Sequence, residues 1–126
     1  MKVGETFIDV GSASTPHLWC ICTEPNADDE VVVVSVTTVR PNVETTCVLQ
    51  PGDHPFVRHE SAAAYRFAEL VSVRELLRLR GQQRHRRHAD ADSSLVQRIR
   101  AGALQSPMTP NKVKKAIREC RWEPSE

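Results

Sequence analysis

The chain of 126 residues has few glycines and none of the common catalytic motifs. Its five glycines form no phosphate-binding loop and no dinucleotide-binding fingerprint. The G-x-S-x-G motif of many serine hydrolases and the H-E-x-x-H motif of many zinc peptidases are also missing. These absences exclude the enzyme classes that those motifs define.

Long apolar stretches are missing as well. No run approaches the roughly 18 apolar residues that a membrane-spanning helix needs. The first ten residues, MKVGETFIDV, lack the basic segment followed by an apolar segment that marks a signal peptide. We therefore expect no contact with membrane and a cytoplasmic protein whose length fits about one domain.

The four cysteines do not form the paired C-x-x-C motifs of zinc sites. Cys20 and Cys22 lie in an apolar run, where a strand would direct both side chains to one face. We predict that Cys20, Cys22 and Cys47 are buried thiols, and we expect no metal or cofactor.

Charge is distributed unevenly, although the net charge is only +1. Residues 1–57 contain two Lys/Arg and eight Asp/Glu, whereas residues 58–126 contain fifteen and eight. This asymmetry fits two halves that attract each other, a basic half that faces a polyanion, or simply solvated helix faces.

The first half of the chain has the pattern of short β-strands, rich in β-branched residues and separated by turn formers. The four consecutive valines at 31–34 indicate a strand that is buried on both faces. A mainly β fold is predicted, a small SH3-like barrel of about five strands with C-terminal helices. The predicted strands span residues 5–10, 18–23, 31–38, 45–49 and 66–71.

Helical patterns follow. Ser72 and Glu75 have the spacing of a capping box and predict a helix over 73–80, which completes a domain of residues 1–80. Residues 81–93 are polar and rich in arginine, and we predict a flexible basic linker. A helical extension is predicted over 94–122, with Ser94 as the cap of its first helix and Thr109-Pro110 at the start of its second.

The segment 51–66, PGDHPFVRHESAAAYR, combines side chains that can cleave RNA. His54 and His59 could exchange protons with the attacking 2′-hydroxyl and the leaving 5′-oxygen. Arg58 or Arg66 could stabilise charge on the phosphorane. These histidines with the neighbouring acids have no recognisable metal-ligand spacing. Further candidates for substrate binding are Thr37, Thr38 and Ser61 as donors to phosphate and Tyr65 and Trp19 as stacking partners of bases.

Structural roles are the alternative for the same residues. His54, before a proline, could shape a turn, and Tyr65 could belong to the core. Thr37 and Thr38 could lie at a strand end only because threonine favours β structure. His17 fits the start of a strand better than a catalytic group.

Several segments resemble the MazF/PemK-type toxins of bacterial toxin–antitoxin pairs. The resemblance covers about residues 4–79, with Pro16-His17 in place of the usual Arg-Pro and Ala68 where an acid is common. The segments that carry it are Gly4-Glu5-Thr6-Phe7, the run HLWCICT at 17–23, the run VVSVTT at 33–38, and Ser61 followed by Arg66 and Leu70.

That resemblance implies a homodimeric, metal-independent endoribonuclease that cuts single-stranded RNA through a 2′,3′-cyclic phosphate and is silenced by an antitoxin protein. It would make Thr37 or Thr38 a phosphate contact and Arg66 the charge stabiliser or general acid. The alternative function is a non-catalytic module that binds nucleic acid or protein.

Overall fold

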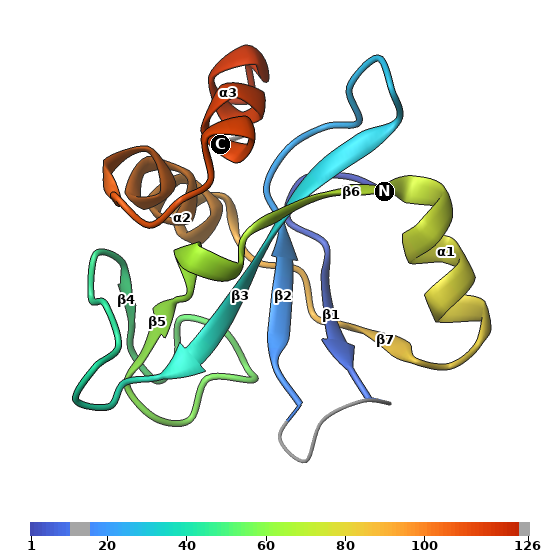
Figure 1. The fold of residues 1–126 in the computed structure, drawn as a ribbon. Helices are drawn as coiled ribbons and strands as arrows, with labels where there is room; N and C mark the ends of the chain where they lie inside the picture. Colours follow the sequence, from blue (N-terminus) through green and yellow to red (C-terminus); the bar gives the residue numbers. More distant parts are fainter. Residues whose placement is uncertain (11–15, 124–126) are drawn as a thin grey trace.

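The computed structural model describes residues 1–10 and 16–123 and consists of one seven-stranded antiparallel sheet with three α-helices (Figure 1). The prediction of a mainly β fold with C-terminal helices is confirmed. The strands are β1 (Thr6–Asp9), β2 (Leu18–Ile21), β3 (Glu30–Thr38), β4 (Val48–Leu49), β5 (Ser61–Ala63), β6 (Glu69–Ser72) and β7 (His85–His88). The helices are the 3₁₀ turn η1 (Tyr65–Phe67) and the α-helices α1 (Val73–Gly81), α2 (Ser93–Gln105) and α3 (Asn111–Glu119).

Strand β3 is the centre of the sheet. One of its edges pairs with β2, and the other edge pairs with β6 in its first half and β5 in its second half. The strand order is β4-β5-β3-β2-β1-β7, and within the described part of the chain β4 and β7 do not pair with each other. The sheet is therefore open, and the predicted closure into a barrel is wrong for this structure.

Apolar side chains cover both faces of the sheet. Helices α2 and α3 pack on one face, where Leu18, Val34 and Val36 meet Ile99 and Val113 in the larger core. Helix α1 lies on the opposite side (Figure 1), and a smaller core forms there. The smaller core contains Phe7, Ile21, Val31, Val33 and Leu76.

The valine run and the cysteines match their predictions. Val31 to Val34 are each at most 2% exposed, because alternate members enter opposite cores. Cys20, Cys22 and Cys47 are buried free thiols. A hydrogen bond with Cys20, together with burial, raises the pKa of the Cys22 thiol well above its ordinary value.

The helices begin close to the predicted residues. Ser72 caps α1 by accepting a hydrogen bond of 3.0 Å from the Glu75 N–H, as the capping box predicted. Helix α2 is instead capped by Asp92, which accepts from the Leu95 N–H at 2.8 Å, so the prediction of Ser94 as the cap is wrong.

The segment predicted as a flexible linker contains strand β7. His85–His88 pair with β1 along its whole length, from Asp9↔His85 to Thr6↔His88. The Arg87 guanidinium lies 3.2 Å from the Glu5 carboxylate. The His85 ring stacks on Phe7 with centroids 4.5 Å apart. A charged sequence can form this strand because β1 offers an open edge and these two side-chain contacts, so the linker prediction is wrong.

Two predicted strands are shorter than expected, and one strand was not foreseen. Of residues 45–49, only Val48–Leu49 are β4. Residues 66–71 divide into the η1 turn and β6. Strand β5 was missed because Ser61–Ala63 are three small residues with no β-forming pattern.

Within the described ranges, none of the helices has the length and apolar character required to cross a membrane.

Candidate functional site

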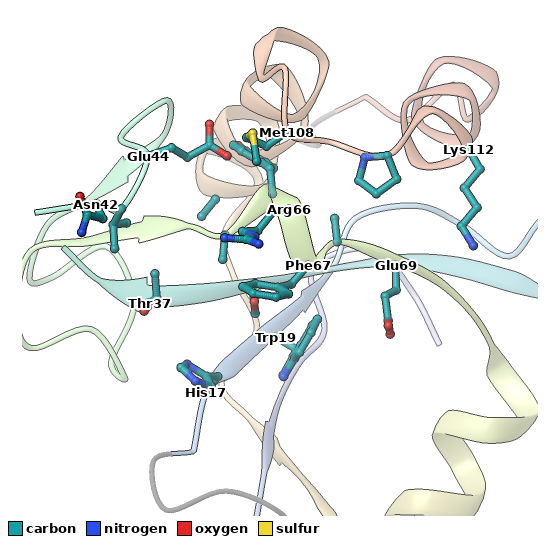
Figure 2. A pocket seen from close by; sticks show the side chains of 17 residues that line it. His17, Trp19, Thr37, Asn42, Glu44, Arg66, Phe67, Glu69, Met108 and Lys112 are labelled. Carbon is teal, nitrogen blue, oxygen red and sulfur yellow. The ribbon is translucent and has the colours of Figure 1, made fainter. Parts of the chain in front are cut away.

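A groove of about 820 Å³ opens between β2, β3 and η1 on one side and the connection between α2 and α3 on the other. Figure 2 shows His17 and Trp19 along its lower side and Glu44, Met108 and Lys112 along its upper side. Its lining also includes Ser35, Thr37, Asn42, Val43, the residues 63–69, and Pro110.

The pairing of β2 with β3 places four polar or aromatic side chains on one face of the sheet, which forms the floor of the groove. Trp19 lies opposite Ser35. His17 and Thr37 are each two residues away from these partners, so they lie on the same face of the sheet. All four residues line the groove, whereas the alternate residues Leu18 and Val36 enter the larger core.

Asp9 holds the start of β2 in position. Its carboxylate accepts the backbone N–H of His17 at 2.7 Å and the indole N–H of Trp19 at 3.3 Å. The Trp19 ring is also parallel to Phe7, with ring centroids 6.4 Å apart. These contacts orient Trp19 and leave the imidazole of His17 without a hydrogen bond to any described residue.

Arg66 and Phe67 project from the η1 turn and form the second element of the site. The Arg66 guanidinium lies 5.0 Å from the centre of the Phe67 ring, which is 57% exposed. No carboxylate of the described residues pairs with Arg66. A cation next to an exposed ring is suited to binding a phosphate and an unpaired base.

Acidic and basic groups are balanced around the groove. Arg66 and Lys112 supply positive charge, and Glu44 and Glu69 supply negative charge. The Ser106 hydroxyl donates its one proton to the Glu44 carboxylate, with Oγ 2.8 and 3.0 Å from the two oxygens, and Thr46 Oγ1 donates at 2.7 Å. Because Glu44 is held by these donors, Glu69 is the acid left to compete for the cations.

Four of the predicted site residues line this groove: Trp19, Thr37, Tyr65 and Arg66. Tyr65 belongs to the wall and is fully buried. Its hydroxyl donates to the Ile99 carbonyl at 2.8 Å, and burial raises its pKa. The structure therefore leaves Tyr65 no free ring face for a base and gives it a role in the core.

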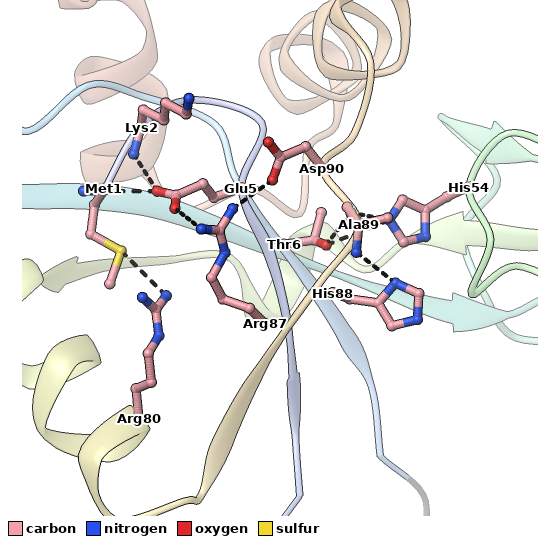
Figure 3. Close-up of polar contacts among 10 residues, drawn as sticks. All are labelled: Met1, Lys2, Glu5, Thr6, His54, Arg80, Arg87, His88, Ala89 and Asp90. Atoms are coloured by element: carbon pink, nitrogen blue, oxygen red, sulfur yellow. Dashed lines mark hydrogen bonds and ion pairs between the residues drawn. The ribbon is translucent and has the colours of Figure 1, made fainter.

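His54 lies away from the groove and is 2% exposed (Figure 3). Its Nδ1 lies 3.0 Å from the Phe56 N–H, and its Nε2 lies 2.5 Å from the Ala89 carbonyl oxygen. Nδ1 must accept and Nε2 must donate, so the ring is a neutral tautomer with both nitrogens occupied. Burial lowers its pKa. The structure thus places His54 as the link between its turn and β7.

The other predicted residues do not meet Arg66 in the groove. Arg58, His59 and Thr38 are exposed and lie outside it. Ser61 is buried, and its hydroxyl donates to the His59 carbonyl at 2.8 Å.

His17, which the sequence analysis assigned to the start of a strand, and Phe67 are among the groove residues that it did not select as candidates. Alternation along β2 was the available signal, because residues 17 and 19 share a face wherever 18 is buried. Phe67 had no such signal, since its exposure depends on the η1 turn.

No group of three or more His, Cys, Asp or Glu side chains in residues 1–10 and 16–123 is arranged to hold a metal ion. Comparison of the chain with known protein families, curated proteins and solved structures finds no match.

Proposed function

We propose that this chain is a toxin-like endoribonuclease that binds single-stranded RNA in the groove and cleaves it without a metal. The observation that supports this most strongly is that Arg66, His17, Thr37 and Trp19 line one groove. The groove therefore combines a cation, an imidazole, a hydroxyl donor and a stacking surface, which can bind a phosphate and a base and accept a proton.

In the proposed reaction the 2′-oxygen attacks the adjacent phosphorus, and the bond from phosphorus to the 5′-oxygen breaks. The imidazole of His17 takes the proton of the 2′-hydroxyl. Arg66 stabilises the charge on the phosphorane, and the leaving 5′-oxygen takes a proton from water. Thr37 donates to a phosphate oxygen, and Trp19 and Phe67 stack on bases. The products are a 2′,3′-cyclic phosphate and a 5′-hydroxyl.

The resemblance to MazF/PemK toxins contributes the remaining parts of the proposal. They are a fold related to the SH3-like barrel, a homodimer, a cytoplasmic location and an antitoxin partner. The two-sided pairing of β3 is compatible with a small barrel that has opened at one edge.

The test is incubation of the purified protein with a long single-stranded RNA in EDTA, followed by analysis of the new ends. Arg66→Ala and His17→Ala should each reduce the cleavage rate by about 100-fold or more. Arg58→Ala and His59→Ala are matched controls outside the groove and should cleave as the wild type does. Intact RNA at enzyme excess would reject the endoribonuclease.

A non-catalytic RNA-binding module is the second candidate. It is favoured by Glu69 in the groove and by the presence of a single histidine there, because two proton transfers usually need two titrating groups. This module would bind single-stranded RNA, lose binding in Arg66→Ala and give no cyclic phosphate.

A further inference from the structure

The guanidinium of Arg80, at the end of α1, has no acidic partner among the described residues. Its Nε is buried without a hydrogen-bond partner, and its Nη2 contacts only the Met1 sulfur, at 3.9 Å (Figure 3). A buried donor without an acceptor costs about 1–3 kcal/mol. Nε itself is closed to solvent, so an anion would be bound by the Nη atoms of the same guanidinium.

Arg80 lies on the same face of the sheet as the groove. Leu76, one turn earlier in α1, packs in the smaller core with Phe7, and Met1 and Trp19 border that core. The His85 ring stacks on Phe7 with centroids 4.5 Å apart, and Phe7 is parallel to Trp19. A row of rings therefore runs from β7 across β1 to the groove.

The acids near His85 are already engaged, whereas the arginines are not. Asp9 accepts from His17 and Trp19, as described above, and Glu75 pairs with Arg78 through hydrogen bonds of 2.5 and 2.8 Å. Burial lowers the pKa of His85. Arg84 directly precedes His85 in the chain, and its backbone N–H donates to the Leu79 carbonyl at 2.9 Å, so Arg84 lies next to the end of α1 that carries Arg80. No described carboxylate pairs with either arginine.

We propose that Arg80 and Arg84 bind a phosphate of the RNA strand outside the groove, so that the strand passes from Trp19 towards His85. This inference rests on the proposed binding of single-stranded RNA. It extends the site by one phosphate contact that neither the chemistry of cleavage nor the groove itself requires.

The test compares two fluorescent single-stranded RNAs, of four and twelve nucleotides, by anisotropy. The double variant Arg80→Gln/Arg84→Gln should weaken binding of the twelve-nucleotide RNA by about tenfold and reduce its salt slope by about 1–2. Binding of the four-nucleotide RNA should stay within about twofold, because it fills only the groove. Arg74→Gln, on the same helix, is the matched control and should change neither.

Equal effects on both RNAs, or no effect on either, would overturn the inference while leaving the groove intact. Failure of the wild type to bind either RNA would overturn the proposed function as well. Loss of both RNAs in Arg66→Ala locates the short RNA in the groove. Arg84→Gln alone, at an exposed position, repeats the comparison if the double variant does not fold, and Arg80→Lys should retain part of the affinity.

Discussion

Adding one methyl group at Gly102 should destabilise the protein although alanine is the better helix former. Gly102 lies in α2 against the buried ring of Tyr65. An alanine Cβ at this position would overlap the Tyr65 hydroxyl oxygen and lie 3.0 Å from Cζ of the same ring and 3.1 Å from Cys47 Cβ. The hydroxyl would have to leave its 2.8 Å hydrogen bond to the Ile99 carbonyl.

The expected change in the free energy of unfolding combines one stabilising and two destabilising contributions. Alanine in place of glycine favours a helix by about 1 kcal/mol. Overpacking of a filled core costs about 1–3 kcal/mol. Loss of the hydrogen bond costs about 1 kcal/mol more. Gly102→Ala should therefore lower the free energy of unfolding by about 1–3 kcal/mol.

Urea denaturation measures this change, and Gly81→Ala is its control. Gly81 is also helical and has no atom within 4 Å of an added Cβ, so its replacement should be neutral or stabilising by up to about 1 kcal/mol. Tyr65→Phe should cost about 1 kcal/mol in the wild type and less in Gly102→Ala, because it removes the overlapping oxygen. A Gly102→Ala protein as stable as the wild type would refute the packing of α2 on Tyr65.

Three further predictions concern stability. Because burial lowers the pKa of His54 from 6.5, the unfolded chain binds more protons than the folded protein below that pH, so the free energy of unfolding should fall on acidification through about 6.5. His54→Gln should flatten the profile in urea titrations, and an unchanged slope would contradict this. Asp92→Ala should lower the free energy of unfolding by about 1 kcal/mol in thermal melts and Ser94→Ala by much less, since Asp92 is the cap of α2. The reverse order would show that Ser94 is the cap. Arg100→Met should speed hydrogen exchange in α3, because Arg100 donates to the carbonyls of Cys22, Ile117 and Cys120; unchanged exchange would show that apolar packing alone holds α3.

The sequence predicted the strands whose side chains alternate or are wholly apolar. The runs at 18–23 and 31–38 have one physical reason to be strands, burial of β-branched and apolar side chains, and that reason is local. Strand β7 has no such reason. Its residues pair with β1 through contacts to Phe7 and Glu5, which are about eighty residues away in the chain.

The candidate site was predicted in part for the same reason. Arg66, Thr37 and Trp19 lie in or beside elements whose position the strand pattern suggested. The direction of the turn around His54 was not predictable, because it depends on the Ala89 carbonyl brought there by β7. The Pro-Gly-Asp sequence at 51–53 indicated that the histidines lie near a turn, but it contained no information on the direction of their side chains.

The pairing of β7 with β1 has a consequence for synthesis of the chain. Strand β1 leaves the ribosome before its partner at His85–His88, which follows only after α1. Until then the nascent sheet has an unprotected edge beside Phe7, and this long sequence separation slows closure of the contact. A fragment that stops near residue 80 would keep that edge permanently, and it should aggregate through this edge more readily than the whole chain.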